Sequence, residues 1–368
     1  MLLDVRQREI LRLIWRENRL SRWELHERTG VNPNAIGNEA GYLLQLGILR
    51  EGAPESVGQG RPRTPLEIDT ATRHVLGLSL SPGQVEIARL NLRGQLLGKT
   101  TAQSAETPTE AIQVAQRFIK QNIKEQTLAV GISSPGFLDA DKKAILFSSI
   151  TRTPEPLQLE GLFQAAGGKQ IVFENDMHAL AVRWLLTHLA EEREDVLLVY
   201  IGDGQLGAAM LIEGRPNRGC LIGANELGHT RFPIETDPCY CGQKGCLERI
   251  VSTAYLKTLD PHLQGTIFER AAHFHTDDEA LKKLSGHLAM GLSNAVNFMW
   301  PNRLVIVSEL TRYSAFCDHL LRTIREKLLF ELVNHVRVDL WDQPGAVSAE
   351  SAGWLALAGL YQEGWKPL

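Results

Sequence analysis

Apolar residues recur at helical spacing through the first fifty positions of the chain. In the segment 10–14 they return at the intervals that one buried face of a helix requires. Ser21, followed three residues later by Glu24, predicts a capping box at the start of a second helix. Gly30 is expected to end that helix, because glycine readily adopts the left-handed conformation found at helix ends. Two short helices are therefore expected before residue 31.

A third helix and two strands follow before the composition changes. Asn32 is the expected N-cap, Pro33 takes the first helical position, where its missing N–H costs nothing, and Gly47 ends the helix. Segment 48–51 then predicts a strand. The Gly- and Pro-rich segment 52–65 excludes a helix or a central strand and predicts a loop or wing tip. A return strand is expected directly after it.

Strands and helices alternate from about residue 75, which predicts an α/β domain with mixed sheets. The expected strands are 75–80, 85–92, 94–100, 128–134, 171–176, 196–202, 208–214 and 303–309. The expected helices are 109–125 and 177–190, and helices dominate after residue 248. The chain is therefore expected to divide into an N-terminal domain of residues 1–70 and an α/β domain of residues 71–368.

Length and composition bound what these domains can be. The chain has 368 residues, of which 43 % are hydrophobic and 22 % charged, enough for two or three globular cores. Its formal net charge of -4 gives no global attraction to nucleic acid, so any DNA binding has to be local. No apolar run is long enough for a membrane span, and the N-terminus does not read as a signal peptide. We expect a cytoplasmic protein.

Three short helices, a strand and a Gly-Arg-Pro wing are typical of a winged helix-turn-helix domain, whose third helix enters the major groove of DNA. The candidate DNA-binding residues are Asn34, Gly37, Asn38 and Gly41 on that helix and Arg61 and Arg63 in the wing. Asparagine can pair with adenine through two hydrogen bonds. The alternative is a small helical domain for protein contacts, because residues 1–66 contain ten arginines and no lysine against eight acids.

Three of the five cysteines lie within eight residues and point to a metal site. His229, Cys239, Cys241 and Cys246 have the spacing H-x9-C-x-C-x4-C. Three thiolates and one imidazole make a closed tetrahedral zinc site, which is structural because no position stays open for water. Such clustering favours a reducing compartment over a disulfide framework. The alternative is a set of unrelated buried cysteines and a core histidine.

The segment ELGHTRF…CYCGQKGCLE, residues 226–248, resembles the signature of the ROK family. That family groups sugar kinases with transcriptional repressors on an actin-like (ribonuclease H-like) fold of two lobes. Segments 129–149 and 171–181 resemble the family's Pro-Gly turn with its hairpin and its Glu-Asn-Asp segment. The resemblance runs from about residue 75 to the end of the chain. The N-terminal domain is similar to that of the repressor branch.

The resemblance also implies which residues bind a sugar and where the lobes divide. The implied sugar ligands are Asn175, Asp176, Glu226, His229 and Glu248. Carboxylates and amides suit the vicinal hydroxyls of a sugar, and charged partners give the stronger hydrogen bonds. Considered one by one, the two glutamates could equally be solvated surface charges. The implied lobes are about 71–175 and 176–368, with a zinc knuckle at 229–246 that orients the pocket.

Three segments that bind nucleotide in the kinases of this family are altered. The opening Asp-x-Gly-Gly-Thr is residues 79–83 here, where serine replaces the aspartate and Pro82 offers no N–H to a phosphate. The second phosphate loop carries Asp203, whose carboxylate would repel phosphate, and residues 307–310 replace the late Gly-Gly-Gly. Asp176 matches the catalytic base of the kinases. Without an electrophile in reach we expect it to be a vestigial base and the protein not to be an enzyme.

These features predict a sugar-responsive transcriptional regulator, a repressor of carbohydrate metabolism, that binds operator DNA, a small sugar or sugar derivative and structural Zn²⁺. A homodimer is expected, because helix-turn-helix proteins usually read paired half-sites. Sugar would close the two lobes and shift the two DNA-binding heads of the dimer. Two alternatives stay open: a bifunctional sugar kinase with a DNA-binding head, and a regulator controlled by a protein partner.

Overall fold

The computed structural model divides into two units, one of residues 1–189 together with 347–368 and one of residues 190–346. It describes residues 3–56, 62–139, 141–148, 155–188, 194–219, 223, 225–275, 277–329, 332–343, 345 and 347–361. Arg61 of the expected wing lies outside these residues. No helix in the described part of the chain is long and apolar enough to cross a membrane.

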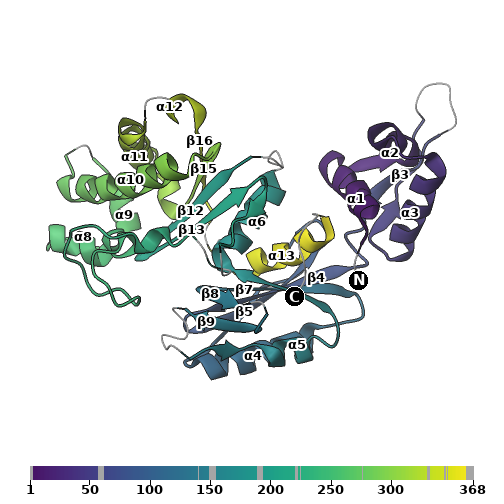
Figure 1. Ribbon diagram of the computed structural model, residues 1–368, viewed down its shortest axis with the longest axis horizontal. Helices are drawn as coiled ribbons and strands as arrows, with labels where there is room; N and C mark the ends of the chain where they lie inside the picture. Colours follow the sequence, from purple (N-terminus) through teal and green to yellow (C-terminus); the bar gives the residue numbers. More distant parts are fainter. Residues whose placement is uncertain are drawn as a thin grey trace. The chain divides into compact units, whose positions relative to one another are not determined.

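The N-terminal segment of unit 1 consists of three helices and a small antiparallel sheet (Figure 1). Its elements are α1 (Val5–Glu17), β1 (Arg19–Ser21), α2 (Arg22–Thr29), α3 (Pro33–Gln45), β2 (Leu49–Glu51) and β3 (Pro65–Ile68). The capping box of Ser21 and Glu24 is present, and Gly30 ends α2 with φ 68°. Asn32 caps α3 through a hydrogen bond from the backbone N–H of Asn34. The expected caps and helices are thus confirmed.

The small sheet has the strand order β1-β3-β2. Strand β1 was not expected, because three residues between two helices leave no period from which a strand could be recognised. An isolated antiparallel bridge joins Glu55 to Arg63 at the base of the Gly- and Pro-rich loop. The described residues on either side of this loop therefore pair as antiparallel strands, and the two strands that the sequence predicted, β2 and β3, are present.

A five-stranded sheet of order β11-β7-β4-β5-β6 forms the centre of the rest of unit 1. The strands are β4 (His74–Ser81), β5 (Gln84–Asn91), β6 (Thr101–Ser104), β7 (Thr127–Ser134) and β11 (Gln170–Asn175). Helices α4 (Pro108–Asn122) and α5 (Glu160–Ala165) cover one face, and α6 (Asp176–His188) and α13 (Ala349–Tyr361) the other (Figure 1). A smaller sheet of order β10-β9-β8 contains β8 (Phe137–Asp139), β9 (Ala144–Phe147) and β10 (Leu157–Gln158).

The third strand was expected at 94–100, and this prediction is wrong. Gly94 and Gly98 have φ 75° and 89°, and such left-handed backbone interrupts a strand. Between them the structure forms only an isolated bridge from Leu90 to Leu96. The regular strand, β6, begins at Thr101 and pairs with β5.

Helix α13 packs closely against this sheet because glycines remove side chains at the contact. A Cβ atom on Gly77 would overlap the carbonyl oxygen of Ala349, and one on Gly131 would overlap that of Ala352. Every residue of the helix from Ala349 to Tyr361 is buried except Glu350, which is half-buried. The backbones of helix and sheet therefore touch directly.

Helix α13 also joins the N-terminal segment to the five-stranded sheet. The Trp15 ring of α1 lies 5.8 Å from the Trp354 ring and 4.7 Å from the Tyr361 ring. Arg93 lies over Trp15 at 5.1 Å and donates hydrogen bonds to three carbonyl oxygens at the end of α1. The three aromatic side chains belong to one hydrophobic cluster that extends from α1 to β4 and β7. The N-terminal segment thus shares a core with the sheet.

Unit 2 has its own five-stranded sheet, of order β14-β13-β12-β15-β16. The strands are β12 (Val196–Gly202), β13 (Gln205–Ile212), β14 (Arg215–Pro216), β15 (Arg303–Val307) and β16 (Arg337–Trp341). The helices are η1 (Leu227–His229), α7 (Leu247–Ile250), α8 (Thr253–Leu259), α9 (Ile267–Ala272), α10 (Glu279–Met299), η2 (Glu309–Arg312), α11 (Ser314–Lys327) and α12 (Leu332–His335). β12 and β13 form the expected hairpin, and β12, β15 and β16 are parallel.

The two units do not coincide with the lobes expected at 71–175 and 176–368. Helix α6, which begins at Asp176, stays in unit 1, and the chain returns to unit 1 with α13. The reason is packing: Ala179, Val182 and Leu186 of α6 share a buried cluster with α13. The chain therefore crosses between the units twice, near residues 190 and 346.

Candidate functional site

Four metal-ligating side chains meet in unit 2, as the cysteine spacing predicted. One donor atom each from His229, Cys239, Cys241 and Cys246 lies within 4.8 Å of all the others. Cys241 Sγ and Cys246 Sγ are 3.6 Å apart, and Cys239 Sγ is 3.6 Å from His229 Nδ1. Tetrahedral bonds of about 2.3 Å to sulfur and 2.0–2.1 Å to nitrogen give ligand separations of roughly this size. The four residues fit a zinc ion.

Local backbone turns hold the cysteines in place. Gly242 and Gly245 have φ 85° and 75°, and a Cβ on Gly245 would overlap the carbonyl oxygen of Phe232. Gly245 N–H donates to Thr236 Oγ1 at 2.9 Å, and Phe232 N–H donates to the Gly245 carbonyl at 2.8 Å. Cys246 then serves as the N-cap of α7. The knuckle is thus joined directly to the helix that follows it.

Burial controls the protonation of two of these ligands. It lowers the pKa of His229, which keeps the imidazole neutral and able to bind a metal. It raises the pKa of the Cys246 thiol to about 12 in the absence of a cation. A bound divalent cation would supply the charge that makes the thiolate the favoured form.

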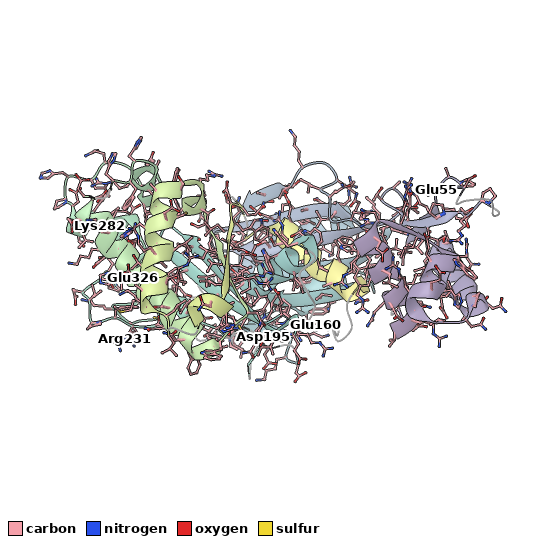
Figure 2. The ribbon with its side chains drawn as sticks, turned by 90° about the horizontal axis from the view of Figure 1, so that it is seen from above. Glu55, Glu160, Asp195, Arg231, Lys282 and Glu326 are labelled. Carbon is pink, nitrogen blue, oxygen red and sulfur yellow. The ribbon has the colours of Figure 1, made fainter. Side chains whose placement is uncertain are left out.

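The two predicted glutamates lie against the same knuckle. Glu226 Oε2 is 3.6 Å from His229 Nε2, on the ring edge opposite the metal-facing Nδ1. Glu248, in the first turn of α7, is buried, and its Oε1 is 3.5 Å from Cys239 Sγ. Arg231, next to η1, marks this region in Figure 2 and pairs in an isolated bridge with Cys246. Both carboxylates are therefore held by the elements that carry the metal ligands.

Tyr240 is a neighbour of this site that sequence reasoning missed. Its hydroxyl lies 2.9 Å from His229 Nε2, and its ring is edge-on to the imidazole at 5.0 Å. Its place between Cys239 and Cys241 was the available signal, since a residue between two ligands has to lie near the metal. Tyr240 and Glu226 thus share the outer edge of His229.

Asn175 and Asp176 lie together in unit 1, where β11 ends and α6 begins. Asn175 is buried; its Nδ2 donates to the Gly136 carbonyl at 3.0 Å, and its Oδ1 accepts from the Met177 N–H at 2.8 Å. Asp176 Oδ1 accepts from the same N–H at 2.8 Å. Below them the imidazole of His178 pairs with Glu174 at 3.0 Å, and both side chains are fully buried. Hydrogen bonds within the protein thus hold the side chains of Asn175 and Asp176 in place.

Burial raises the pKa of Asp176 from its ordinary value of 3.8 to about 6. Replacing Asp176 with asparagine is therefore expected to stabilise the protein at pH 7–8, by at most about 3 kcal/mol. The sign follows because the pKa of this carboxyl group is higher in the folded protein than in the unfolded chain. Such a group favours folding at pH values below its pKa in the unfolded chain. This contribution is lost as the pH rises through its pKa in the folded protein. The advantage of D176N should vanish below about pH 4.

Urea unfolding of both proteins from pH 4 to pH 8 measures this difference. Asp139→Asn is the control, because hydrogen bonds from Lys142 lower the pKa of Asp139. That variant should gain nothing at neutral pH. An equal gain for both variants, or a gain for D176N that is as large at pH 4 as at pH 8, would contradict the prediction.

The candidate DNA-binding residues on α3 share an open face. Asn34 and Asn38 are exposed and stand one turn apart. A Cβ on Gly37 or Gly41 would meet nothing within 4 Å, so the glycines leave the helix backbone accessible. Arg63 lies over the ring of Trp23 at 5.7 Å, on the ribbon that holds the loop. Trp23 was not singled out from the sequence, although it is 47 % exposed.

Side chains in the segments that the sequence analysis compared with the nucleotide-binding motifs of the kinases form hydrogen bonds within the protein. In unit 2, Asp203 accepts hydrogen bonds from the backbone N–H and the hydroxyl of Thr253 at 2.7 and 2.6 Å. Thr253 is the first residue of α8, so the carboxylate occupies donors that could otherwise receive an anion. Ser308 Oγ donates to the Ile201 carbonyl at 2.7 Å. In unit 1, Pro82 and Gly83 form the tight turn between β4 and β5.

A cavity of about 160 Å³ lies beside Asp203, lined also by Arg249, Ser252 and Tyr255. Sites for drug-sized ligands are typically about 300–1,000 Å³. The volume of this cavity lies below that range.

Comparison with known proteins places these features in a family. The model of the ROK family matches residues 75–361. The chain is 24 % identical over 316 residues to the xylose repressor of Bacillus subtilis, covering 82 % of this chain and 81 % of the repressor. The crystal structure of a ROK family transcriptional regulator, a homolog of the Escherichia coli protein Mlc, matches with TM-score 0.79 at 19 % identity, over 97 % of both chains. A ROK family glucokinase from Streptomyces griseus, solved with glucose and AMPPNP, matches with TM-score 0.60 at 20 % identity, over 76 % of this chain and 98 % of the kinase.

Proposed function

Because the chain belongs to the ROK family and has its two-lobed sugar-kinase fold, we propose that it is a sugar-responsive, DNA-binding transcriptional repressor. One observation carries the proposal: a helical segment with an exposed third helix precedes the family domain, and the match to a ROK regulator extends through it. The kinase match covers a smaller share of the chain. The relative from Bacillus subtilis bears the name of a sugar repressor.

The N-terminal segment is proposed to be a winged helix-turn-helix. Asn34 and Asn38 would contact base edges in the major groove, since both side chains are exposed on α3. The open glycine face would allow close approach of the helix to the duplex. Arg63 would contact the phosphate backbone or the minor groove from the ribbon, and Arg61 is proposed for the same role from the sequence alone.

The proposed sugar ligands are the residues that the family resemblance implies, Asn175, Asp176, Glu226, His229 and Glu248. Asn175 and Asp176 lie at the start of α6 in unit 1, and Glu226, His229 and Glu248 lie at the knuckle in unit 2. A buried amide and carboxylates can accept and donate to vicinal hydroxyls. The outer edge of His229 faces away from the metal when Nδ1 binds it, and a sugar at this edge would also contact Tyr240 and Glu226.

The metal is proposed to be a structural zinc ion. All four donors come from the protein, so a tetrahedral ion would have no open position and would supply no catalytic water. Its role would be to fix His229 and the helix that carries Glu248.

Phosphoryl transfer is not part of the proposed function. Asp203 places a carboxylate on the N-terminal donors of α8, which opposes phosphate binding at that turn. Pro82 lacks an N–H for the first phosphate loop. Asp176 would therefore act as a hydrogen-bond partner of the sugar.

Thermal unfolding of the full-length, zinc-loaded protein with a panel of sugars, phosphosugars and ATP with Mg²⁺ tests the proposal. We expect one sugar to raise the melting temperature and ATP to have no effect. Glu226→Ala should weaken the affinity for that sugar about tenfold or more, the usual loss for a hydrogen bond to a charged group. Glu326→Ala on α11, an exposed glutamate outside the site, is the matched control.

The same preparation is then assayed on DNA selected from a random library, with and without the stabilising sugar. A change in DNA affinity with sugar is the expected result, since a ligand that prefers one conformation shifts the equilibrium towards it. Stabilisation by ATP together with sugar-dependent release of ADP would establish a kinase instead. A protein that responds to no sugar would favour control by a protein partner.

A further inference from the structure

A cavity of unit 2 is lined mainly by polar side chains. It has a volume of about 160 Å³ and lies between the turn from β12 to β13, the knuckle of residues 229–246 and the segment that contains α7 and α8. An arginine, Arg249, a tyrosine, Tyr255, and two aspartates, Asp203 and Asp237, line it together with three hydroxyl-bearing residues. An apolar cavity of about 150 Å³ binds benzene, so a ligand of roughly six to ten non-hydrogen atoms fits this volume.

Most polar groups around the cavity have partners within the protein. The hydroxyls of Thr236, Ser252 and Thr258 each donate their hydrogen to a nearby backbone carbonyl, at 2.7–3.0 Å. A hydroxyl has one hydrogen, so none of the three has a hydrogen left for a ligand. The carboxylate of Asp203 accepts the two hydrogen bonds from Thr253 and keeps lone pairs for a further donor. These bonds hold the walls of the cavity in place.

Two hydrogen-bond donors at the cavity have no acceptor among the described residues. Tyr255 is only 5 % exposed, and its hydroxyl forms no hydrogen bond in the described part of the chain. Burial raises the pKa of Tyr255, so the hydroxyl keeps its hydrogen. Arg249 is half-buried, and its Nε is fully buried without a hydrogen-bond partner. Leaving such donors unpaired costs free energy, which an acceptor placed in the cavity would recover.

The charges around the cavity have both signs. The guanidinium of Arg249 forms no ion pair among the described residues. A Cβ on Gly204 would lie 3.9 Å from its Nη1, so the cation is beside the turn that carries Asp203. Asp237 is exposed and adds a second carboxylate from the knuckle. A ligand that carries a positive and a negative group would therefore find a partner for each of them.

We infer that this cavity binds a small amino acid in its zwitterionic form. The carboxylate of the ligand accepts hydrogen bonds from Arg249 and Tyr255, and its ammonium group donates to Asp203 and Asp237. Alanine and serine are within the size range that the cavity admits. Inorganic phosphate is a poorer match, since the two carboxylates repel it. A neutral polyol is also a poorer match, because it leaves the guanidinium without a counter-charge.

This site is independent of the proposed sugar site. None of the residues that line the cavity is a proposed sugar or metal ligand. Binding of an amino acid can therefore be measured without sugar and without DNA, and its failure would leave the proposed repressor function untouched.

Titration calorimetry of the full-length, zinc-loaded protein with L-alanine and L-serine tests the inference. We expect saturable binding of one amino acid per chain. L-lactate, in which a hydroxyl replaces the ammonium group, and ethylamine, which lacks the carboxylate, should each bind about tenfold more weakly or less, because each loses a charge-assisted hydrogen bond. Lactate that binds as tightly as alanine, or displacement of alanine by an equal concentration of inorganic phosphate, would overturn the assigned ligand class.

Two variants test the assigned residues. Arg249→Gln should weaken the binding of alanine about tenfold or more, and Tyr255→Phe, which removes only a hydroxyl, about threefold or more. Arg325→Gln on α11, an exposed arginine outside the cavity, is the matched control and should bind as the wild type does. Zinc content and circular dichroism show that each variant is folded, and Y255F keeps the buried ring if R249Q does not fold. A wild type that binds neither amino acid, or folded variants that bind alanine as tightly as the wild type, would overturn the inference.

Discussion

Replacing Cys246 with serine is expected to remove the bound metal and to unfold the knuckle of residues 229–246. The Cys246 thiol is buried 3.6 Å from Cys241, so the hydroxyl of serine would leave three ligands and an incomplete tetrahedron. Binding of structural zinc contributes to folding free energy directly, about 10–16 kcal/mol in isolated zinc-finger peptides. A loss of several kcal/mol is expected here, because the rest of unit 2 has its own core.

Zinc content and the melting temperature of the purified variant measure this effect. Bound zinc should fall from one ion per chain to near zero, and the response to sugar should disappear, since Cys246 caps the helix that carries Glu248. Cys317→Ser is the matched control, because Cys317 is a buried cysteine of α11 outside the cluster. It should keep its zinc. A C246S protein that retains one zinc ion and the wild-type melting temperature would refute the assignment.

Replacing Gly131 with alanine is expected to detach α13 from the central sheet of unit 1. The new methyl group would overlap the carbonyl oxygen of Ala352. Neither can rotate away, because the strand backbone sets the position of the Cβ and the oxygen belongs to the helix backbone. Overpacking commonly costs about 1–3 kcal/mol, and we expect at least the upper end because helix and sheet would have to separate. The N-terminal segment should loosen as well, since Trp15 packs on Trp354.

Urea unfolding and limited proteolysis of α13 measure this second effect. The control is Gly37→Ala in α3, where the added Cβ meets nothing within 4 Å. That variant should be as stable as the wild type or up to about 1 kcal/mol more stable, because alanine favours the helix. If G131A and G37A showed the same stability, the close approach of α13 to the sheet would not hold in solution.

The sequence was most informative where local chemistry determines structure. The Ser21–Glu24 box and the Asn32–Pro33 start each combine a cap with a helix, and the structure contains both. The cluster of metal ligands could be predicted equally well from the sequence, because the ligand types and their spacing restrict the geometry before any fold is known. The hairpin of β12 and β13 could likewise be recognised from two apolar runs separated by a Gly-rich turn.

Elements whose packing depends on residues distant in the sequence could not be predicted in the same way. Helix α13 is apolar all round, so it has no polar face from which its period or its partners could be read. Its return to unit 1 also explains why the lobe boundary near residue 175 was wrong, since nothing local shows that α6 packs against residues 349–361. The contact of Tyr240 with His229 depends on how the knuckle folds.

The place of α13 in unit 1 has a consequence for the order in which the protein can fold during synthesis. Unit 2 is one continuous stretch, 190–346, inserted between the two parts of unit 1. The sheet of unit 1 is made earlier, yet the face that α13 covers stays open until residues 349–361 emerge. Trp15, near the end of α1, packs against the same helix and so gains this contact only when α13 has been made. The segment made first is thus among the last to find its packing partner.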